Sequence, residues 1–130
     1  MISILLIDDE PSIKEIGTAL FESVGCSVTS TLNSSEALTI FQKQSLSFDL
    51  VITDYMRPDM RGDKLASALR FIRPEIPVFI CSGHGNIRET ELKNWGVDGL
   101  LSKPYEIEEI ARLVCRTLRG KVKELAGITA

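Results

Sequence analysis

The chain has 130 residues, of which 44% are hydrophobic, and its 15 basic and 18 acidic residues give a formal charge of −3. With no basic run or stripe in the sequence, direct binding to nucleic acid is not expected. The longest apolar stretch is far shorter than the ~20 residues of a transmembrane helix, and the N-terminal segment does not have the pattern of a signal peptide. We therefore expect one cytoplasmic domain with a single core that does not enter a membrane.

The cysteines Cys26, Cys81 and Cys115 are widely spaced and lie within apolar patterns. An odd number of cysteines at such spacings does not fit a disulfide framework. All three are expected to be reduced thiols in the core.

The first half of the chain alternates strand and helix patterns. Residues 2–7 are almost continuously apolar, as in a strand covered on both faces, whereas residues 26–31 alternate weakly and indicate an edge strand. Pro11 suits the first turn of the helix between them, and Asn33 with Glu36 resembles the capping box of the next helix. The apolar faces of these two helices are expected at Ile13, Ile16, Leu20 and Val24, and at Ala37, Leu38 and Phe41.

The second half continues the alternation. Strands are expected at 50–53, 78–81 and 97–102, with a flexible loop at 82–85 and a short helix with a poor apolar stripe at 86–95. The stripes of the other two helices are expected at Leu65, Ala66, Leu69 and Ile72, and at Ile107, Ile110, Ala111, Val114, Cys115 and Leu118. The domain is expected to span 1–119, with 120–130 as a helix extension, a linker or a frayed tail.

Alternating strands and helices predict an α/β fold with a parallel sheet and helices on both faces. The edge character of the second strand favours the flavodoxin-like, doubly wound (βα)5 order 2-1-3-4-5. In such sheets ligands bind beyond the carboxyl ends of the strands, where strands one and three diverge.

Polar groups follow four of the expected strands. Asp8 and Asp9 follow the first strand, Asp54 the third, Ser82 the fourth and Lys103 the fifth. Crowded carboxylates repel one another unless one is protonated or a cation relieves them. Lys103 leaves a formal charge of about −2 across the cluster, which a divalent cation would neutralise. Oxygen ligands favour Mg²⁺ or Mn²⁺.

A carboxylate beside a metal ion and an ammonium can act as a nucleophile toward phosphorus. Phosphoryl transfer depends mainly on positioning and charge neutralisation, and Lys103 and the Ser82 hydroxyl could hold the phosphoryl oxygens while the metal bridges them to Asp54. No nucleotide-binding glycine loop is present in the sequence, so the donor is not expected to be ATP bound by this chain.

Several short motifs occur in a specific order: Asp8-Asp9-Glu10-Pro11, Asp54-Tyr55-Met56-Arg57-Pro58 with Gly62, Ser82-Gly83, and Lys103-Pro104-Tyr105. Together they resemble the receiver domain of two-component response regulators, over roughly residues 2–119. The resemblance implies that a sensor histidine kinase or a phosphotransfer protein transfers a phosphoryl group from a phosphohistidine to Asp54. It also implies a signalling module that catalyses only its own phosphorylation and dephosphorylation.

The resemblance assigns a role to each site residue. Asp9, Asp54 and the backbone carbonyl of Met56 bind Mg²⁺, and Asp8 assists through water. Ser82 and Lys103 contact the phosphoryl group, and the bond between Lys103 and Pro104 is expected to be cis.

One position departs from the family. Leu100 stands where receivers often carry an aromatic ring that moves on phosphorylation, so another route, such as movement of the loop 82–84, is needed to reach the helix 86–95 and the last helix.

Other interpretations stay open. His84 could tune hydrolysis of the acyl phosphate or be an exposed loop residue, and Trp95 is expected to serve packing. Arg57 and Arg61 could form a solvated loop or meet an anionic partner. The chain could instead be an aspartate-nucleophile phosphatase, although Met56 stands where that class carries a second aspartate, or a docking domain independent of phosphorylation. The kinase, a C-terminal effector domain or docking target, and a homodimer through the last helices are left undetermined.

Overall fold

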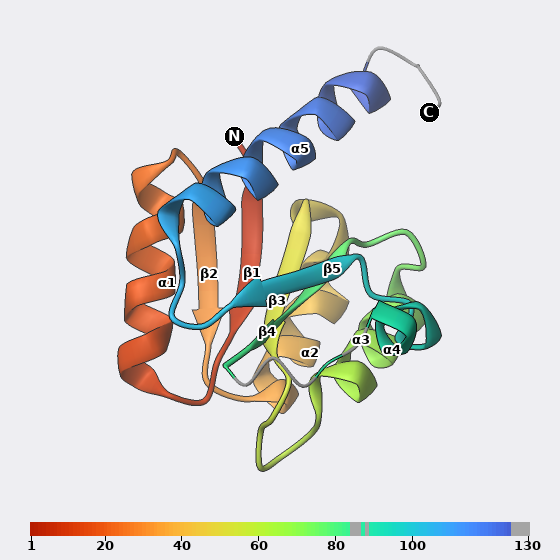
Figure 1. The fold of residues 1–130 in the computed structure, drawn as a ribbon. Helices are drawn as coiled ribbons and strands as arrows, with labels where there is room; N and C mark the ends of the chain where they lie inside the picture. The colour runs from red at the N-terminus through yellow and green to blue at the C-terminus, as the bar shows by residue number, and fades with distance from the viewer. Residues whose placement is uncertain (84–86, 88, 126–130) are drawn as a thin grey trace.

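A computed structural model describes residues 1–83, 87 and 89–125 of the protein, without the side chains of residues 89 and 121–125. In these residues five parallel strands form one sheet in the order β2-β1-β3-β4-β5 (Figure 1). The strands are β1 (Ser3–Ile7), β2 (Ser27–Thr31), β3 (Leu50–Asp54), β4 (Val78–Ser82) and β5 (Gly99–Ser102). The predicted order, with the second strand at an edge, is confirmed.

Helices follow the strands in alternation. They are α1 (Pro11–Ser23), α2 (Ser34–Gln44), α3 (Gly62–Ile72), α4 (Glu89–Trp95) and α5 (Ile107–Leu125), with a 3₁₀ turn at Ser45–Ser47. Figure 1 shows α1 and α5 on one face of the sheet and α2 and α3 on the other, with α4 beside α3. The expected start of the fourth helix, at residue 86, lies outside the described residues.

The sheet is buried on both faces because successive residues of its central strands point to opposite sides. Ile4 and Leu6 of β1 belong to the core under α1 and α5, whereas Leu5 and Ile7 belong to the core under α2 and α3. This explains the continuous apolar run of the first strand. The side chain of Asn33 accepts a hydrogen bond of 2.8 Å from the backbone N–H of Glu36, so the predicted cap of α2 is also confirmed.

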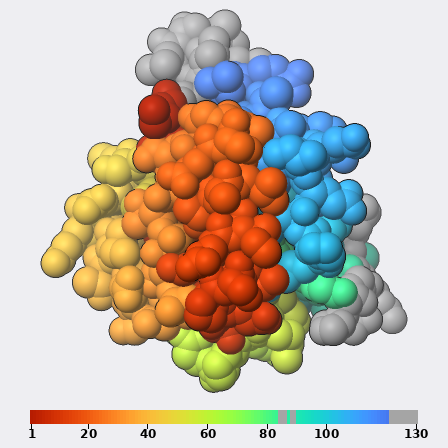
Figure 2. Space-filling model, turned by 90° about the vertical axis from the view of Figure 1, so that its left-hand side faces the viewer, coloured from red at the N-terminus to blue at the C-terminus, as the bar shows by residue number. Residues whose placement is uncertain are grey.

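The apolar stripe predicted for α1 is partly wrong. Ile16 is 50% exposed, and the buried residues of the helix are Gly17 and Phe21. The helix approaches the sheet at Gly17, where an added Cβ would lie 2.8 Å from the ring of Tyr105 and 3.2 Å from Leu6. Close packing at this glycine turns Ile16 outward. Figure 2 shows α1 across the middle of this face of the molecule, with α5 beside it.

The stripe predicted for α5 is also partly wrong. Ile110 and Val114 are buried as expected, together with Leu113, which lies outside the predicted stripe. Ile107 and Leu118 are each 46% exposed, and Cys115 is exposed too, so it is not a core thiol. The apolar residues of α5 occupy a wider arc than the sheet covers. None of the helices in the described part of the chain is long and apolar enough to cross a membrane.

Candidate functional site

The register of the sheet brings the predicted site residues to one edge. β1 and β3 pair in parallel up to Ile7 and Thr53, so the next residues, Asp8 and Asp54, lie level with each other. The end of β5 pairs with the end of β4, which brings Lys103 to the same edge. The chain leaves the end of β1 toward β2 and the end of β3 toward β4, so the two connections diverge at this point. Ligands are expected to bind there in this fold.

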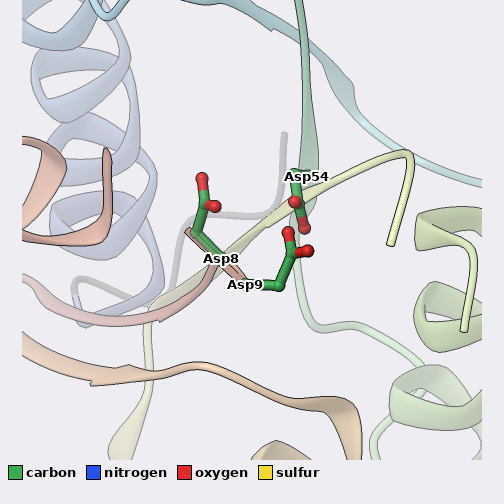
Figure 3. A group of neighbouring side chains, drawn as sticks. All are labelled: Asp8, Asp9 and Asp54. Carbon is green, nitrogen blue, oxygen red and sulfur yellow. The ribbon is translucent and has the colours of Figure 1, made fainter. Parts of the chain in front are cut away.

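Three carboxylates meet at this edge. One oxygen from each of Asp8, Asp9 and Asp54 lies within 4.8 Å of the others, a spacing at which they could hold a metal ion (Figure 3). Asp8 is fully buried and Asp54 is 4% exposed, so solvent screens their charges poorly. Carboxylate oxygens are hard ligands, and such a set fits a hard divalent cation.

Lys103 supplies positive charge to the triad. Its Nζ lies 2.9 Å from Oδ2 of Asp8 and 3.7 Å from Oδ2 of Asp54. Burial by itself would lower the pKa of Lys103, but the ion pair with Asp8 outweighs it and holds the pKa above its ordinary value. The peptide bond between Lys103 and Pro104 is cis, as expected from the family resemblance.

The carboxyl of Asp54 is strongly perturbed. Burial raises its pKa most, the neighbouring Asp9 and Asp8 raise it further, and together they outweigh Lys103 and Arg57 and bring the pKa to about 8. The site without metal therefore retains a proton at neutral pH. A divalent cation would relieve the same repulsion and release that proton.

A small cavity of about 180 Å³ opens beside Asp54. Its lining includes Ser82 and Lys103, the two residues predicted to contact the phosphoryl group. It also includes Met56, whose backbone carbonyl is a predicted metal ligand. The other lining residues are Glu10, Tyr55, Cys81 and Gly83. The structure thus brings these residues together, while their roles toward metal and phosphoryl group stay predictions.

The structure corrects the interpretation of Arg57. Rather than lying in a solvated loop, its side chain is fully buried, and its Nε lies 3.0 Å from Oδ1 of Asp54. Its Nη2 donates a 2.8 Å hydrogen bond to the backbone carbonyl of Met60. Arg61 does lie at the surface, where it forms an ion pair of 3.0 Å with Asp63. Sequence periodicity could not separate these two arginines of one loop.

Two tyrosines, Tyr55 and Tyr105, make aromatic contacts near the site. Tyr55, directly after Asp54, stacks on Trp95 of α4 with ring centroids 5.0 Å apart and planes 15° apart, so Trp95 serves packing as expected. Tyr105 packs edge-on against Phe21, and its hydroxyl lies 3.6 Å from Sγ of Cys81, a residue of the cavity lining. His84, proposed as a tuning residue, lies outside the described residues.

The family model for the response regulator receiver domain matches residues 4–114. The chain belongs to this family. It is thus a signalling module rather than a conventional enzyme, and the expected family and the flavodoxin-like fold are both confirmed.

Solved structures of receivers are similar to this one over most of their length. A response regulator receiver domain protein from Clostridium thermocellum is 30% identical, with a TM-score of 0.85, and the match covers 93% of this chain and 97% of that one. The chemotaxis protein CheY4 of Vibrio cholerae is 27% identical, with a TM-score of 0.79 and coverage of 90% and 98%.

Curated relatives are much longer proteins. Transcription factor SKN7 of Chaetomium thermophilum is 26% identical over 93% of this chain but only 16% of its own length. Sensor kinase CckA of Brucella abortus is 29% identical over 86% of this chain and 12% of its own length. Receivers related to this one therefore occur within both kinases and transcription regulators.

Proposed function

We propose that this receiver accepts a phosphoryl group on Asp54 from the phosphohistidine of a sensor histidine kinase or a phosphotransfer protein. The observation that carries the proposal is the position of Asp54, where the acidic triad, the ammonium of Lys103 and the small cavity meet. Occurrence of related receivers in kinases and regulators supports a place in a two-component phosphorelay.

The transfer is a substitution at phosphorus. A carboxylate oxygen of Asp54 attacks, the P–N bond of the donor breaks, and its electron pair stays on the imidazole nitrogen, which takes up a proton. The product is a mixed anhydride, the aspartyl phosphate. Lys103 and the Ser82 hydroxyl hold the phosphoryl oxygens, and their positive charge and hydrogen bonds stabilise the charge in the transition state.

The residues present fit a divalent cation. Asp9, Asp54 and the backbone carbonyl of Met56 would hold Mg²⁺ or Mn²⁺, with Asp8 assisting through water. Such an ion neutralises charge between the carboxylates and the phosphoryl group. Its fit rests on the buried, crowded triad and on the raised pKa of Asp54, which a bound cation would reverse. Dephosphorylation follows when a water oxygen attacks the phosphorus from the cavity, the P–O bond to Asp54 breaks, and the carboxylate of Asp54 and inorganic phosphate are released.

The wider setting of the receiver follows from the same proposal. We place the receiver unit at 1–119 in the cytoplasm, with its output through a C-terminal effector domain or a docked target. Direct contact with nucleic acid is not part of the proposal. α5 continues past residue 119 to Leu125, which fits a helix extension at the start of 120–130. A homodimer through the last helices is compatible with the exposed apolar residues Ile107 and Leu118 of α5.

Incubation with acetyl phosphate and Mg²⁺, followed by intact mass, tests the proposal. We expect a gain of one phosphoryl group that is labile to base and is lost in Asp54→Asn and in the presence of a chelator. No gain with acetyl phosphate or with a phosphorylated histidine kinase, under conditions where Mg²⁺ binds, would contradict it and favour a docking domain independent of phosphorylation.

A further inference from the structure

Arg57 is a second cation beside Asp54, and the proposed reaction assigns it no role so far. Its guanidinium approaches Oδ1 of Asp54 at 3.0 Å, whereas Lys103 lies on the side of Oδ2. The two oxygens of the carboxylate therefore face different cations. Arg57 is absent from the lining of the cavity, while Asp54 and Lys103 both contribute to it. Oδ2 is thus the oxygen on the side where a phosphoryl group would enter.

Residues of the loop between β3 and α3 contact the guanidinium of Arg57 at its Nη atoms. Its Nη2 donates to the carbonyl of Met60 at 2.8 Å, and its Nη1 lies 4.0 Å from Oδ1 of Asp59. Asp59 is in turn fixed because its Oδ2 accepts a 2.7 Å hydrogen bond from the backbone N–H of Ser34. The arginine is therefore anchored at its far end and directed at the acceptor.

The contact between Arg57 and Asp54 is an ion pair without a well-formed hydrogen bond. Nε and Nη1 of Arg57 and Oδ1 of Asp54 are all buried and have no hydrogen-bond partner. Buried polar atoms are rarely left this way, and a guanidinium keeps its charge at any ordinary pH. The guanidinium thus places a permanent, buried positive charge directly beside the carboxylate of Asp54, on the Oδ1 side that faces away from the cavity.

The balance of charge indicates which state these donors favour. With Lys103, Arg57 and a divalent cation, the triad carries about one excess positive charge before phosphorylation. A phosphoryl group brings about two negative charges in place of the single charge of Asp54, so the phosphorylated site is about neutral. Without Arg57 the unphosphorylated site would be neutral, and the phosphorylated one would keep about one excess negative charge.

We propose that Arg57 is a positioning residue of the phosphoacceptor site, which holds Oδ1 of Asp54, directs Oδ2 to the phosphoryl group and stabilises the phosphorylated state by its buried charge. This inference rests on the proposed function, because it assigns Arg57 a part in that same reaction. The alternative is that the ion pair of Arg57 with Asp54 is purely structural and only fixes the loop after β3.

The test compares Arg57→Met and Arg57→Lys with wild type and with Arg61→Met, which removes an arginine from the same loop but at its surface. Two ligands are titrated: Mg²⁺ alone by calorimetry, and beryllium fluoride, a tetrahedral analogue of the phosphoryl group, by ¹⁹F NMR at saturating Mg²⁺. In Arg57→Met we expect beryllium fluoride to bind about tenfold more weakly or worse. We expect Mg²⁺ alone to bind at least about threefold more tightly, because the triad has lost a neighbouring cation.

Opposite shifts of the two affinities are the signature of the charge, since a site that is merely disordered would lose affinity for both ligands. Arg57→Lys keeps the charge and should lie between wild type and Arg57→Met for both ligands, and it decides the question if Arg57→Met does not fold. Arg61→Met should match wild type. Weaker binding of both ligands, or unchanged or tighter binding of beryllium fluoride, overturns the role of Arg57.

Failure of the proposed function gives a different result. A wild-type chain that binds Mg²⁺ but gains no phosphoryl group and binds no beryllium fluoride overturns the proposed function, and the role of Arg57 with it. A wild-type chain that does both, while Arg57→Met binds beryllium fluoride equally well, overturns the role of Arg57 alone.

Discussion

Lys103 lies 2.9 Å from Oδ2 of Asp8 but 3.7 Å from Oδ2 of the proposed acceptor, Asp54. Asp8 is fully buried, and the cost of burying it is offset by this ion pair and by the 3.0 Å hydrogen bond that its Oδ1 accepts from the backbone N–H of Glu10. A phosphoryl group on Asp54 would place a larger negative charge within reach of the same ammonium. Lys103 can therefore exchange one partner for the other, and its loss should affect both stability and reaction.

Lys103→Met should slow phosphorylation by acetyl phosphate about 10²-fold, because the phosphoryl oxygens lose a positioned cation. It should also lower the free energy of unfolding by about 1–3 kcal/mol, because Asp8 is left buried without its partner. Intact mass over time and urea unfolding measure the two effects. Lys64→Met, at an exposed position of α3, is the matched control and should change neither. An unchanged rate in Lys103→Met would remove Lys103 from the phosphoryl site.

The raised pKa of Asp54 predicts how stability depends on pH in the absence of metal. The carboxyl titrates at a pKa of about 8 in the folded protein but near ~3.9 in an unfolded chain. Between these values the folded protein holds a proton that the unfolded chain has lost. The free energy of unfolding should therefore fall as the pH rises from about 4 to about 8. Urea unfolding with a chelator, at about pH 5 and about pH 8, measures the trend.

Two controls isolate Asp54 as the source of this trend. Asp54→Asn removes the titrating group, so its stability should change less over the same pH range. Mg²⁺ should stabilise wild type more at about pH 8 than at about pH 5, because it binds the deprotonated carboxylate. If the stability of wild type changed with pH in the same way as that of Asp54→Asn, the proton would not be held at Asp54.

The stack of Tyr55 on Trp95 connects the proposed acceptor, Asp54, to α4. It does so in a receiver that carries Leu100 at the position where an aromatic ring is common. Since the chain has one tryptophan, its fluorescence reports on this stack. Phosphorylation should change the emission of Trp95, because Tyr55 directly follows Asp54. Tyr55→Leu should suppress that change and lower stability by about 1 kcal/mol, while phosphorylation itself persists.

Tyr55→Phe is the matched control for this prediction, since it keeps the ring and should keep both the signal and the stability. Asp54→Asn with acetyl phosphate should show no change in emission. If Tyr55→Leu shows the full wild-type change on phosphorylation, the signal reaches Trp95 by another route.

Much of the fold and the site could be predicted because it depends on short-range pattern. Apolar runs place the strands, and the ends of parallel strands meet at one edge, so the sequence alone predicts that Asp8, Asp54 and Lys103 lie close together, as they do. The same reasoning fails for the burial of a helix residue, because that burial depends on how far the sheet extends under the helix. The sheet covers Ile110 and Leu113 of α5 but leaves Cys115 exposed, and the sequence carries no sign of that limit.

Arg57 shows the other limit of prediction from sequence. A loop has no periodicity, and nothing in the order Met56-Arg57-Pro58 indicates that the side chain turns inward to Asp54 rather than outward like that of Arg61. The direction depends on how the loop itself folds, which brings the carbonyl of Met60 and the carboxylate of Asp54 to the guanidinium.

Gly62 begins α3 directly against the backbone of Asp54. Its N–H donates a 2.8 Å hydrogen bond to the carbonyl of Tyr55, and an added Cβ would lie 2.7 Å from the carbonyl oxygen of Asp54. A backbone carbonyl cannot move aside as the end of a flexible side chain can. Gly62→Ala must therefore displace the start of α3 or the backbone of Asp54 at the end of β3. We expect a loss of about 1–3 kcal/mol in the free energy of unfolding, together with slower phosphorylation.

Gly120→Ala is the matched control, because Gly120 lies in α5 and an added Cβ there meets nothing within 4 Å. Alanine favours a helix over glycine by up to about 1 kcal/mol, so this variant should be as stable as wild type or slightly more so, with normal phosphorylation. Urea unfolding and intact mass of both variants give the comparison. If Gly62→Ala proved as stable and as reactive as Gly120→Ala, contact between the start of α3 and the acceptor would not hold Asp54 in place.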